Sequence, residues 1–251
     1  MAEAEKSFWE HLDDLRASLI KIFAATLVFM VLAFCFKDLL FKIVLAPKDS
    51  SFFIYQILGG EEFSINLMNI GLTEQFIIHL KTAFAFGVLL SSPYTIKVLF
   101  NFISPALYKN EKKYSIFIVF SSYVMFLVGV CLNYLLIFPL TVRFLGTYQV
   151  SCEVSNMLTL ESYMETLLMM SVIFGIIFEI PILSLILAKI GLLNSIYMIK
   201  YRRHTVVAIL IVAAIITPTG DAFTLFLVSL PIWILYEASI LIVKSTEKKI
   251  S

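Results

Sequence analysis

The stretch Tyr114–Val142, YSIFIVFSSYVMFLVGVCLNYLLIFPLTV, contains no charged residue. An α-helix needs about 20 predominantly apolar residues to cross the hydrocarbon core of a bilayer, and this stretch exceeds that length. Of the 251 residues in the chain, 60% are hydrophobic, and the mean hydropathy is +0.94. A water-soluble domain of this size has too little interior to bury so much apolar surface. The sequence therefore predicts an all-α, polytopic integral membrane protein.

Charged and turn-forming segments divide the rest of the chain into further apolar runs. With the first stretch they predict six transmembrane helices in a single membrane domain over residues 1–251. The predicted spans are about 19–36, 76–100, 114–138, 164–188, 204–217 and 222–241. An even number of spans places both chain ends on the same side of the membrane.

Basic residues are distributed unevenly over the predicted loops. Most of the 19 lysines and arginines lie in the N-terminal segment, in the second and fourth connecting loops and in the C-terminal tail. The opposite loops hold only Lys37, Lys42, Lys48 and Arg143. Because cytoplasmic loops are enriched in Lys and Arg, both termini are predicted to be cytoplasmic, in a multi-pass protein of the cytoplasmic (inner) membrane. The net charge of +1 gives no reason to expect nucleic acid as a partner.

The last two spans are predicted to form a short hairpin. Residues 204–217 and Ala222–Tyr236 each give about 22 Å of helix at ~1.5 Å per residue, less than the roughly 30 Å of a hydrocarbon core. The linking segment Pro218–Asp221 has the composition of a turn. Such a hairpin either thins the bilayer locally or is sheltered by packed neighbours, and the sequence leaves both possibilities open.

Glu179 is the only charged residue in the run 166–188. A charged carboxylate at a helix centre costs at least about 2.5 kcal/mol on insertion scales, so Glu179 should face protein or water, or be protonated. Pro181 has no backbone N–H, which frees the carbonyl of Ile177 and favours a kink beside the carboxylate. The pair predicts an intramembrane polar site, with a structural hydrogen bond to a neighbouring helix as the alternative.

The N-terminal segment predicts an amphipathic helix that runs into the first span. Phe8, Leu12 and Leu15 have the spacing i, i+4, i+7, which places them on one helix face. The nearby charges Asp14 and Arg16 would, by composition alone, be solvated surface groups. The same holds for Glu111, which lies among lysines in a predicted loop and could form ion pairs worth under about 1 kcal/mol.

Six sequence strings, in order over nearly the whole chain, resemble the TatC family of twin-arginine protein translocases. The loop string SPALYKNE over Ser104–Glu111 is the most specific single match, because it resembles the family's PxLYxxE loop. The others are His11–Arg16, Ala46-Pro47, Thr73–Phe76, Phe174–Pro181, and Thr217-Pro218 with Asp221, Pro231 and Tyr236-Glu237. The resemblance implies a concave, glove-like arrangement of the six helices.

The resemblance also implies a function and the residues that carry it. A member of this family binds twin-arginine signal peptides on the cytoplasmic face and, with TatA/TatB-type single-span partners and further copies of itself, exports folded proteins by the proton-motive force. The implied signal-peptide residues are Asp14, Arg16, Leu107, Tyr108 and Glu111. Planar guanidinium groups match carboxylate forks, for which lysine is a poor substitute. Asp14 departs from the family's usual Glu and reaches one methylene less far.

Four further residues take their expected roles from the resemblance. Glu179 and Pro181 would form an intramembrane site that faces the concave side and docks a partner helix. Pro47 and Asp221 would occupy loop positions of structural or functional importance.

Two other classes of protein compete with this interpretation. A proton- or cation-coupled secondary transporter could use Glu179 at the membrane midplane, although transporters usually show repeats and several polar residues at that depth. A membrane enzyme is disfavoured because the sequence has no HExxH, GxSxG or phosphate-loop pattern. We therefore expect no catalytic residue, cofactor or metal.

Overall fold

The computed structural model describes residues 8–59, 63, 65–103, 115–148, 157–217 and 220–250. The helices in these ranges are α1 (Phe8–Cys35), α2 (Lys37–Leu45), α3 (Phe53–Leu58), α4 (Glu74–Ile103), α5 (Ser115–Leu132), α6 (Phe138–Thr147), α7 (Leu160–Ile177), α8 (Ile180–Lys189), α9 (Ser195–Lys200), α10 (Arg202–Ile216) and α11 (Ala222–Ile250). A parallel bridge joins β1 (Leu67–Met68) to β2 (Leu158–Thr159). The prediction of an all-α fold is confirmed.

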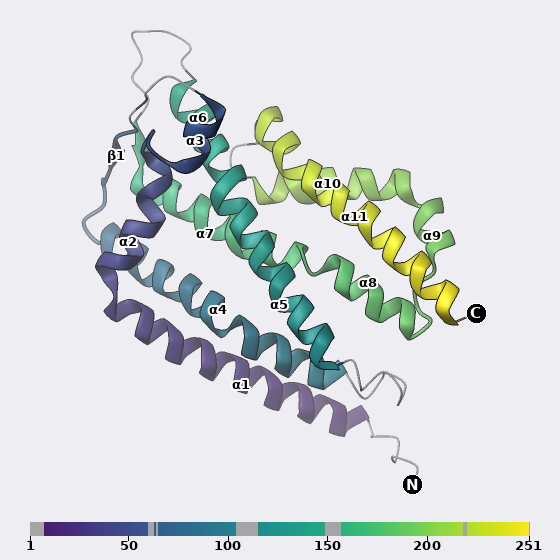
Figure 1. Cartoon of the computed structure of the whole chain (residues 1–251). Helices are drawn as coiled ribbons and strands as arrows, with labels where there is room; N and C mark the ends of the chain where they lie inside the picture. Colours follow the sequence, from purple (N-terminus) through teal and green to yellow (C-terminus); the bar gives the residue numbers. More distant parts are fainter. Residues whose placement is uncertain are drawn as a thin grey trace.

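The long helices lie side by side, and both ends of the described chain lie at the same end of the bundle (Figure 1). α1 runs along one edge, next to α4, while α2, α3 and α6 gather at the opposite end. Five helical stretches of the described residues are long and apolar enough to cross a membrane: Trp9–Cys35, Glu74–Phe102, Ile116–Thr147, Leu160–Lys189 and Ala222–Glu247.

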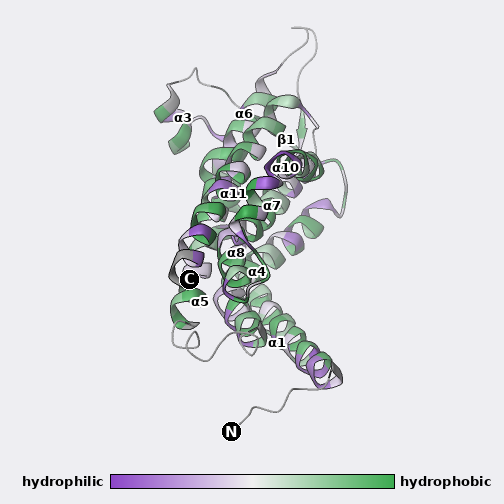
Figure 2. Cartoon of the chain, turned by 90° about the vertical axis from the view of Figure 1, so that its right-hand side faces the viewer, coloured by the Kyte–Doolittle hydropathy of each residue, from purple (hydrophilic) through white to green (hydrophobic). Residues whose placement is uncertain are grey.

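Hydrophobic residues predominate along these helices (Figure 2), and many of their side chains are exposed. Ile116 and Phe117 on α5 are 83% and 70% exposed, and Ile215 on α10 is 71% exposed. Apolar patches of this extent are not left in water by soluble monomers, whereas lipid covers them without cost. The protein is therefore a multi-pass membrane protein, with α10 as a further, shorter span that is fifth of the six in chain order.

The prediction of two short final spans is right for α10 and wrong for α11. α10 has 15 residues, whereas α11 has 29. The hairpin estimate counted the last helix only to Tyr236, although the predicted span extended to 241. The Glu237 carboxylate that follows lies 2.6 Å from the Arg202 guanidinium at the start of α10. Because this pairing removes the charge from the lipid, the helix continues, and Ile240 and Val243 beyond it are fully buried.

α1 is one continuous helix, as predicted for the N-terminal segment and the first span. It packs closely against α4: the Thr26 and Ser91 hydroxyl oxygens lie 3.0 Å apart. A Cβ on Gly87 would lie 2.9 Å from the backbone nitrogen of Met30, so only glycine permits this approach. Small residues at such crossings are typical of membrane helices, which associate by close packing.

The end of the bundle remote from the chain termini forms a compact cap. Three short helices follow the first span: α2, the 3₁₀-helix η1 (Ala46–Lys48) and α3. Pro47 is buried in this cap, and the Tyr55 hydroxyl lies 2.9 Å from the carbonyl oxygens of Pro47 and Pro139. Burial raises the pKa of Tyr55 well above its usual value, so the hydroxyl stays a hydrogen-bond donor at physiological pH.

Glu74 ties the cap to two spans. Its carboxylate accepts backbone N–H bonds from Ile70 (3.0 Å), Gly71 (2.7 Å) and, at the start of α7, Glu161 (3.1 Å). The residue is 8% exposed. Hydrogen bonds to a charged group contribute about 1.5–3 kcal/mol each, so this carboxylate joins the loop, α4 and α7 into one unit.

Glu74→Gln should lower the thermal unfolding temperature of the detergent-solubilised protein. The amide keeps the shape but loses the charge and one acceptor, and we expect a loss of about 1–3 kcal/mol in the free energy of unfolding. The neighbouring exposed residue offers a control, since Gln75→Ala removes no such bond and should leave the unfolding temperature unchanged. Equal unfolding temperatures for Glu74→Gln and the wild type would show that the carboxylate does not hold the cap.

Candidate functional site

The fourth span is broken beside Glu179, as Pro181 predicts. α7 ends at Ile177 and α8 begins at Ile180. The backbone N–H of Glu179 bonds to the carbonyl of Ile176 at 3.0 Å, a tighter turn than that of an α-helix. The chain thus bends within the membrane at the residue that carries the carboxylate.

The side chain of Glu179 is half-buried, and only part of its hydrogen-bonding capacity is used within the described chain. The Ser122 hydroxyl of α5 lies within hydrogen-bonding reach of its carboxylate. Oε1 is buried and has no hydrogen-bond partner among the described residues. Buried polar atoms are normally paired, so an unpaired carboxylate oxygen in a membrane span marks a place where a donor from outside the chain could bind.

Two glycines bring α5 and α7 together at this bend. A Cβ on Gly129 would lie 2.5 Å from the carbonyl oxygen of Phe174, and a Cβ on Gly175 would lie 2.5 Å from the ring of Phe126. The backbones of the two helices therefore approach as closely as glycine allows. Gly175 belongs to the sequence string around Glu179, whereas the role of Gly129 was not predicted.

A π-helix, η4 (Asn133–Ile137), interrupts the third span between α5 and α6. Asn133 is fully buried; its amide nitrogen bonds to the Ser171 hydroxyl of α7 at 2.9 Å, and its Oδ1 lacks a partner among the described residues. Single π turns within α-helices often occur at functional sites. The π-helix could not be predicted from this uncharged run, because only the amide side chain of Asn133 distinguishes the position from its apolar neighbours.

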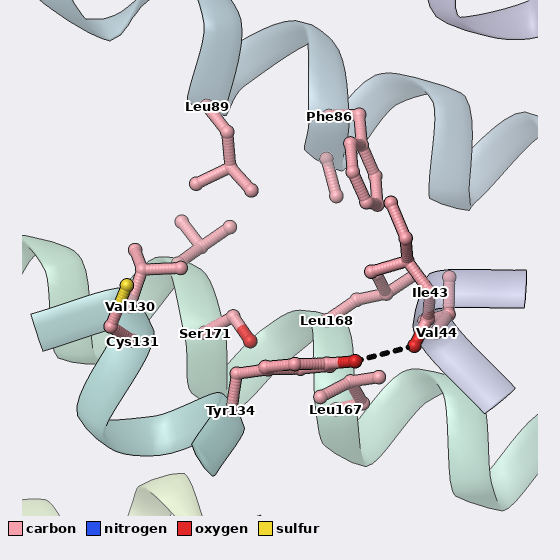
Figure 3. Close-up of a pocket in the computed structure, with 12 residues that line it drawn as sticks. Ile43, Val44, Phe86, Leu89, Val130, Cys131, Tyr134, Leu167, Leu168 and Ser171 are labelled. Atoms are coloured by element: carbon pink, nitrogen blue, oxygen red, sulfur yellow. Dashed lines mark hydrogen bonds between the residues drawn. The ribbon is translucent and has the colours of Figure 1, made fainter. Parts of the chain in front are cut away.

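An apolar hollow of about 190 Å³ lies between α2, α4, α5 and α7 (Figure 3). Phe86 and Leu89 of α4 face Leu167 and Leu168 of α7 across it. On its α2 side the Tyr134 hydroxyl donates to the carbonyl of Ile43 at 2.7 Å. Glu179 does not line this hollow, so the carboxylate and the hollow are separate features.

A more polar groove of about 400 Å³ lies between α1 and α4, near the chain termini. Asp14 lines it, together with His11, whose ring stacks on Phe102 with centroids 4.4 Å apart. Arg16 is exposed and lies outside the groove lining. The structure therefore places Asp14, but not Arg16, in a recess that a ligand could enter.

The other predicted residues are distributed as follows. Leu107, Tyr108 and Glu111 lie outside the described residues, so their distances from Asp14 stay undetermined. Asp221 caps α11, since its Oδ1 accepts the N–H of Thr224 at 2.7 Å. That contact gives Asp221 a structural role, as side-chain caps satisfy otherwise unpaired N–H groups at a helix start.

A family model described as "Sec-independent protein translocase protein (TatC)" matches residues 10–231. The TatCy protein of Bacillus subtilis is 28% identical over 98% of this chain and 91% of its own length. The TatC protein of a Blattabacterium from Periplaneta americana is 32% identical over 98% of this chain and 97% of its own length.

A solved structure has the same architecture. The crystal structure of a twin-arginine translocase receptor, TatC, superposes with a TM-score of 0.80 at 30% sequence identity. The match covers 94% of this chain and 99% of that one. The six-helix arrangement predicted from the sequence agrees with this fold.

Proposed function

The chain belongs to the TatC family of Sec-independent protein translocase components, and from that premise we propose that it is the receptor that binds twin-arginine signal peptides. The observation that carries the proposal is the recessed carboxylate of Asp14 at the terminal end of α1 and α4. We place this end in the cytoplasm because most of the basic residues lie there. The protein family consists of translocase components, which supports recognition and assembly in place of catalysis or solute transport.

Asp14 and Glu111 bind the two arginines of the signal peptide in this proposal. Each guanidinium carries a permanent charge and pairs with a carboxylate through two parallel N–H bonds, which lysine cannot form. Leu107 and Tyr108, in the same loop as Glu111, contact the residues beside the arginines. Arg16 is exposed and contributes only at the groove margin.

Glu179 serves assembly in this proposal. A single-span partner of the TatA/TatB type places a polar side chain against the bend, where Oε1 of Glu179 lacks a donor among the described residues. Further copies of the chain complete the receptor complex. The folded cargo then crosses by the proton-motive force, and this chain supplies recognition and a docking platform.

An export assay tests the receptor assignment. Cells that lack their own translocase core receive this protein, its cognate partners and a reporter with a twin-arginine signal peptide. We expect export of the reporter, and a loss of export when both arginines become lysines, because the carboxylates then lose their bidentate contacts. Absence of export, or equal export of both reporters, would contradict the assignment.

A further inference from the structure

The groove between α1 and α4 contains two lysines that recognition of arginine does not use. Lys21 and Lys97 line it and are exposed, and Tyr94 lines it three residues before Lys97 on α4. Lys21 follows Asp14 by seven residues on α1, about two turns at ~3.6 residues per turn, so the lysines form a part of the groove separate from that carboxylate. Lysines at this place would repel guanidinium groups, so this part of the groove suits an anionic ligand.

The alignment of α1 and α4 places Lys21 and Lys97 at the same level along the helix axes. α1 and α4 run antiparallel, and the contact between Thr26 and Ser91 fixes their alignment. Lys21 lies five residues before Thr26, and Lys97 lies six residues after Ser91. Both ammonium groups therefore enter the groove at one level, about a turn and a half from the Thr26–Ser91 contact at ~3.6 residues per turn.

From that level a lysine side chain can extend to the lipid head groups. Lys21 lies near the middle of the 28-residue helix α1, about 20 Å from its Cys35 end at ~1.5 Å per residue. A lysine at this depth extends its ammonium group toward the nearest head-group layer. α1 runs along one edge of the bundle, so the surrounding lipid has access to the groove (Figure 1).

An apolar surface continues from the lysines toward the membrane interior. Val28 and Leu32 follow Lys21 at i+7 and i+11 on α1 and are 59% and 50% exposed. Leu90 lies one turn before Tyr94 on α4 and is 49% exposed. A ligand with an anionic head and a long apolar tail would fit both parts of this surface.

We propose that Lys21 and Lys97 bind the phosphate of an anionic phospholipid in the leaflet at the terminal end of the bundle, with an acyl chain over Val28 and Leu90. Basic pockets between membrane helices on the cytoplasmic side are known to take such head groups. The proposal depends on the membrane location of the chain and is independent of signal-peptide binding.

Photo-crosslinking tests the site. The full chain with benzoylphenylalanine at Tyr94 is reconstituted in phosphatidylcholine vesicles that contain a minor fraction of phosphatidylglycerol, and the lipid adducts are measured by mass spectrometry. We expect phosphatidylglycerol adducts enriched over the bulk lipid by about tenfold or more, since each lysine near the surface favours anionic lipid. The double variant Lys21→Gln/Lys97→Gln should lose the enrichment. Lys42→Gln/Lys48→Gln, at the opposite end, should retain it.

Two further crosslinking experiments distinguish a phospholipid site from a folding defect and from a phosphate-ion site. Lys21→Arg/Lys97→Arg preserves both charges and should preserve the enrichment, which separates lost charge from lost folding. Inorganic phosphate should leave the adducts unchanged, whereas displacement by it would indicate a phosphate-ion site. Three results would each overturn the proposal: adducts in bulk proportion, enrichment that survives Lys21→Gln/Lys97→Gln, or loss of enrichment in the arginine variant.

Discussion

Glu179→Ala should abolish export of a twin-arginine reporter while signal-peptide binding continues. The substitution removes the carboxylate at the bend between α7 and α8, and with it the acceptor that we assign to a partner helix. A hydrogen bond to a charged group contributes about 1.5–3 kcal/mol, so partner affinity should fall by about ten- to a hundredfold. Co-purification of the single-span partners measures this affinity directly.

A carboxylate elsewhere in the same span, Glu165 on α7, provides the control. Glu165 pairs with Lys81, with side chains about half exposed, and a pair of this kind contributes little to stability. Glu165→Ala should therefore leave partner binding and export near the wild-type level. If Glu179→Ala instead prevents signal-peptide binding, the carboxylate acts in recognition and our assignment to assembly is wrong.

Gly129→Val should prevent the protein from accumulating in the membrane. The new Cβ would lie 2.5 Å from the carbonyl oxygen of Phe174 and 2.8 Å from the ring of Phe178. Overpacking of a core typically costs about 1–3 kcal/mol, and here the opposing atom belongs to the backbone, which yields less than a side chain. We expect a strong decrease in membrane-bound protein and in the unfolding temperature of whatever remains.

The adjacent residue separates this effect from mere added volume. Val128 is 43% exposed, so Val128→Leu extends a side chain toward lipid and should leave accumulation unchanged. Wild-type levels of Gly129→Val, with an unchanged unfolding temperature, would mean that α5 and α7 do not approach each other at this glycine.

The sequence was sufficient to predict most of the fold because long apolar runs without charged residues identify membrane spans. The absence of charge over Tyr114–Val142 and the lone Glu179 in its run both reflect the cost of burying charge in lipid. Pro181 predicted the break in the fourth span for an equally local reason. The error at α11 arose because a charge ends a span only when nothing neutralises it, and Arg202 does so from another helix.

Features that depend on contacts between distant segments could not be predicted. From the sequence, Glu74 is an acidic residue in the first turn of a helix. In the structure its carboxylate also accepts backbone hydrogen bonds from a loop and from the start of α7. The π turn at Asn133 and the close approach at Gly129 likewise exist only because α7 lies opposite. For the candidate site, the sequence predicted Asp14, and the structure added the groove in which Asp14 lies with Lys21 and Lys97.

The central claim is that carboxylates on the terminal face recognise paired arginines. Fluorescence anisotropy of a labelled signal peptide, titrated with the purified full chain in lipid nanodiscs, tests it for Arg-Arg and Lys-Lys forms of the same peptide. We predict that the wild type binds the Arg-Arg form at least about tenfold more tightly, and that Asp14→Asn/Glu111→Gln binds both forms equally weakly. Equal affinity of the wild type for the two peptides, or a double variant that keeps the arginine preference, would contradict the account.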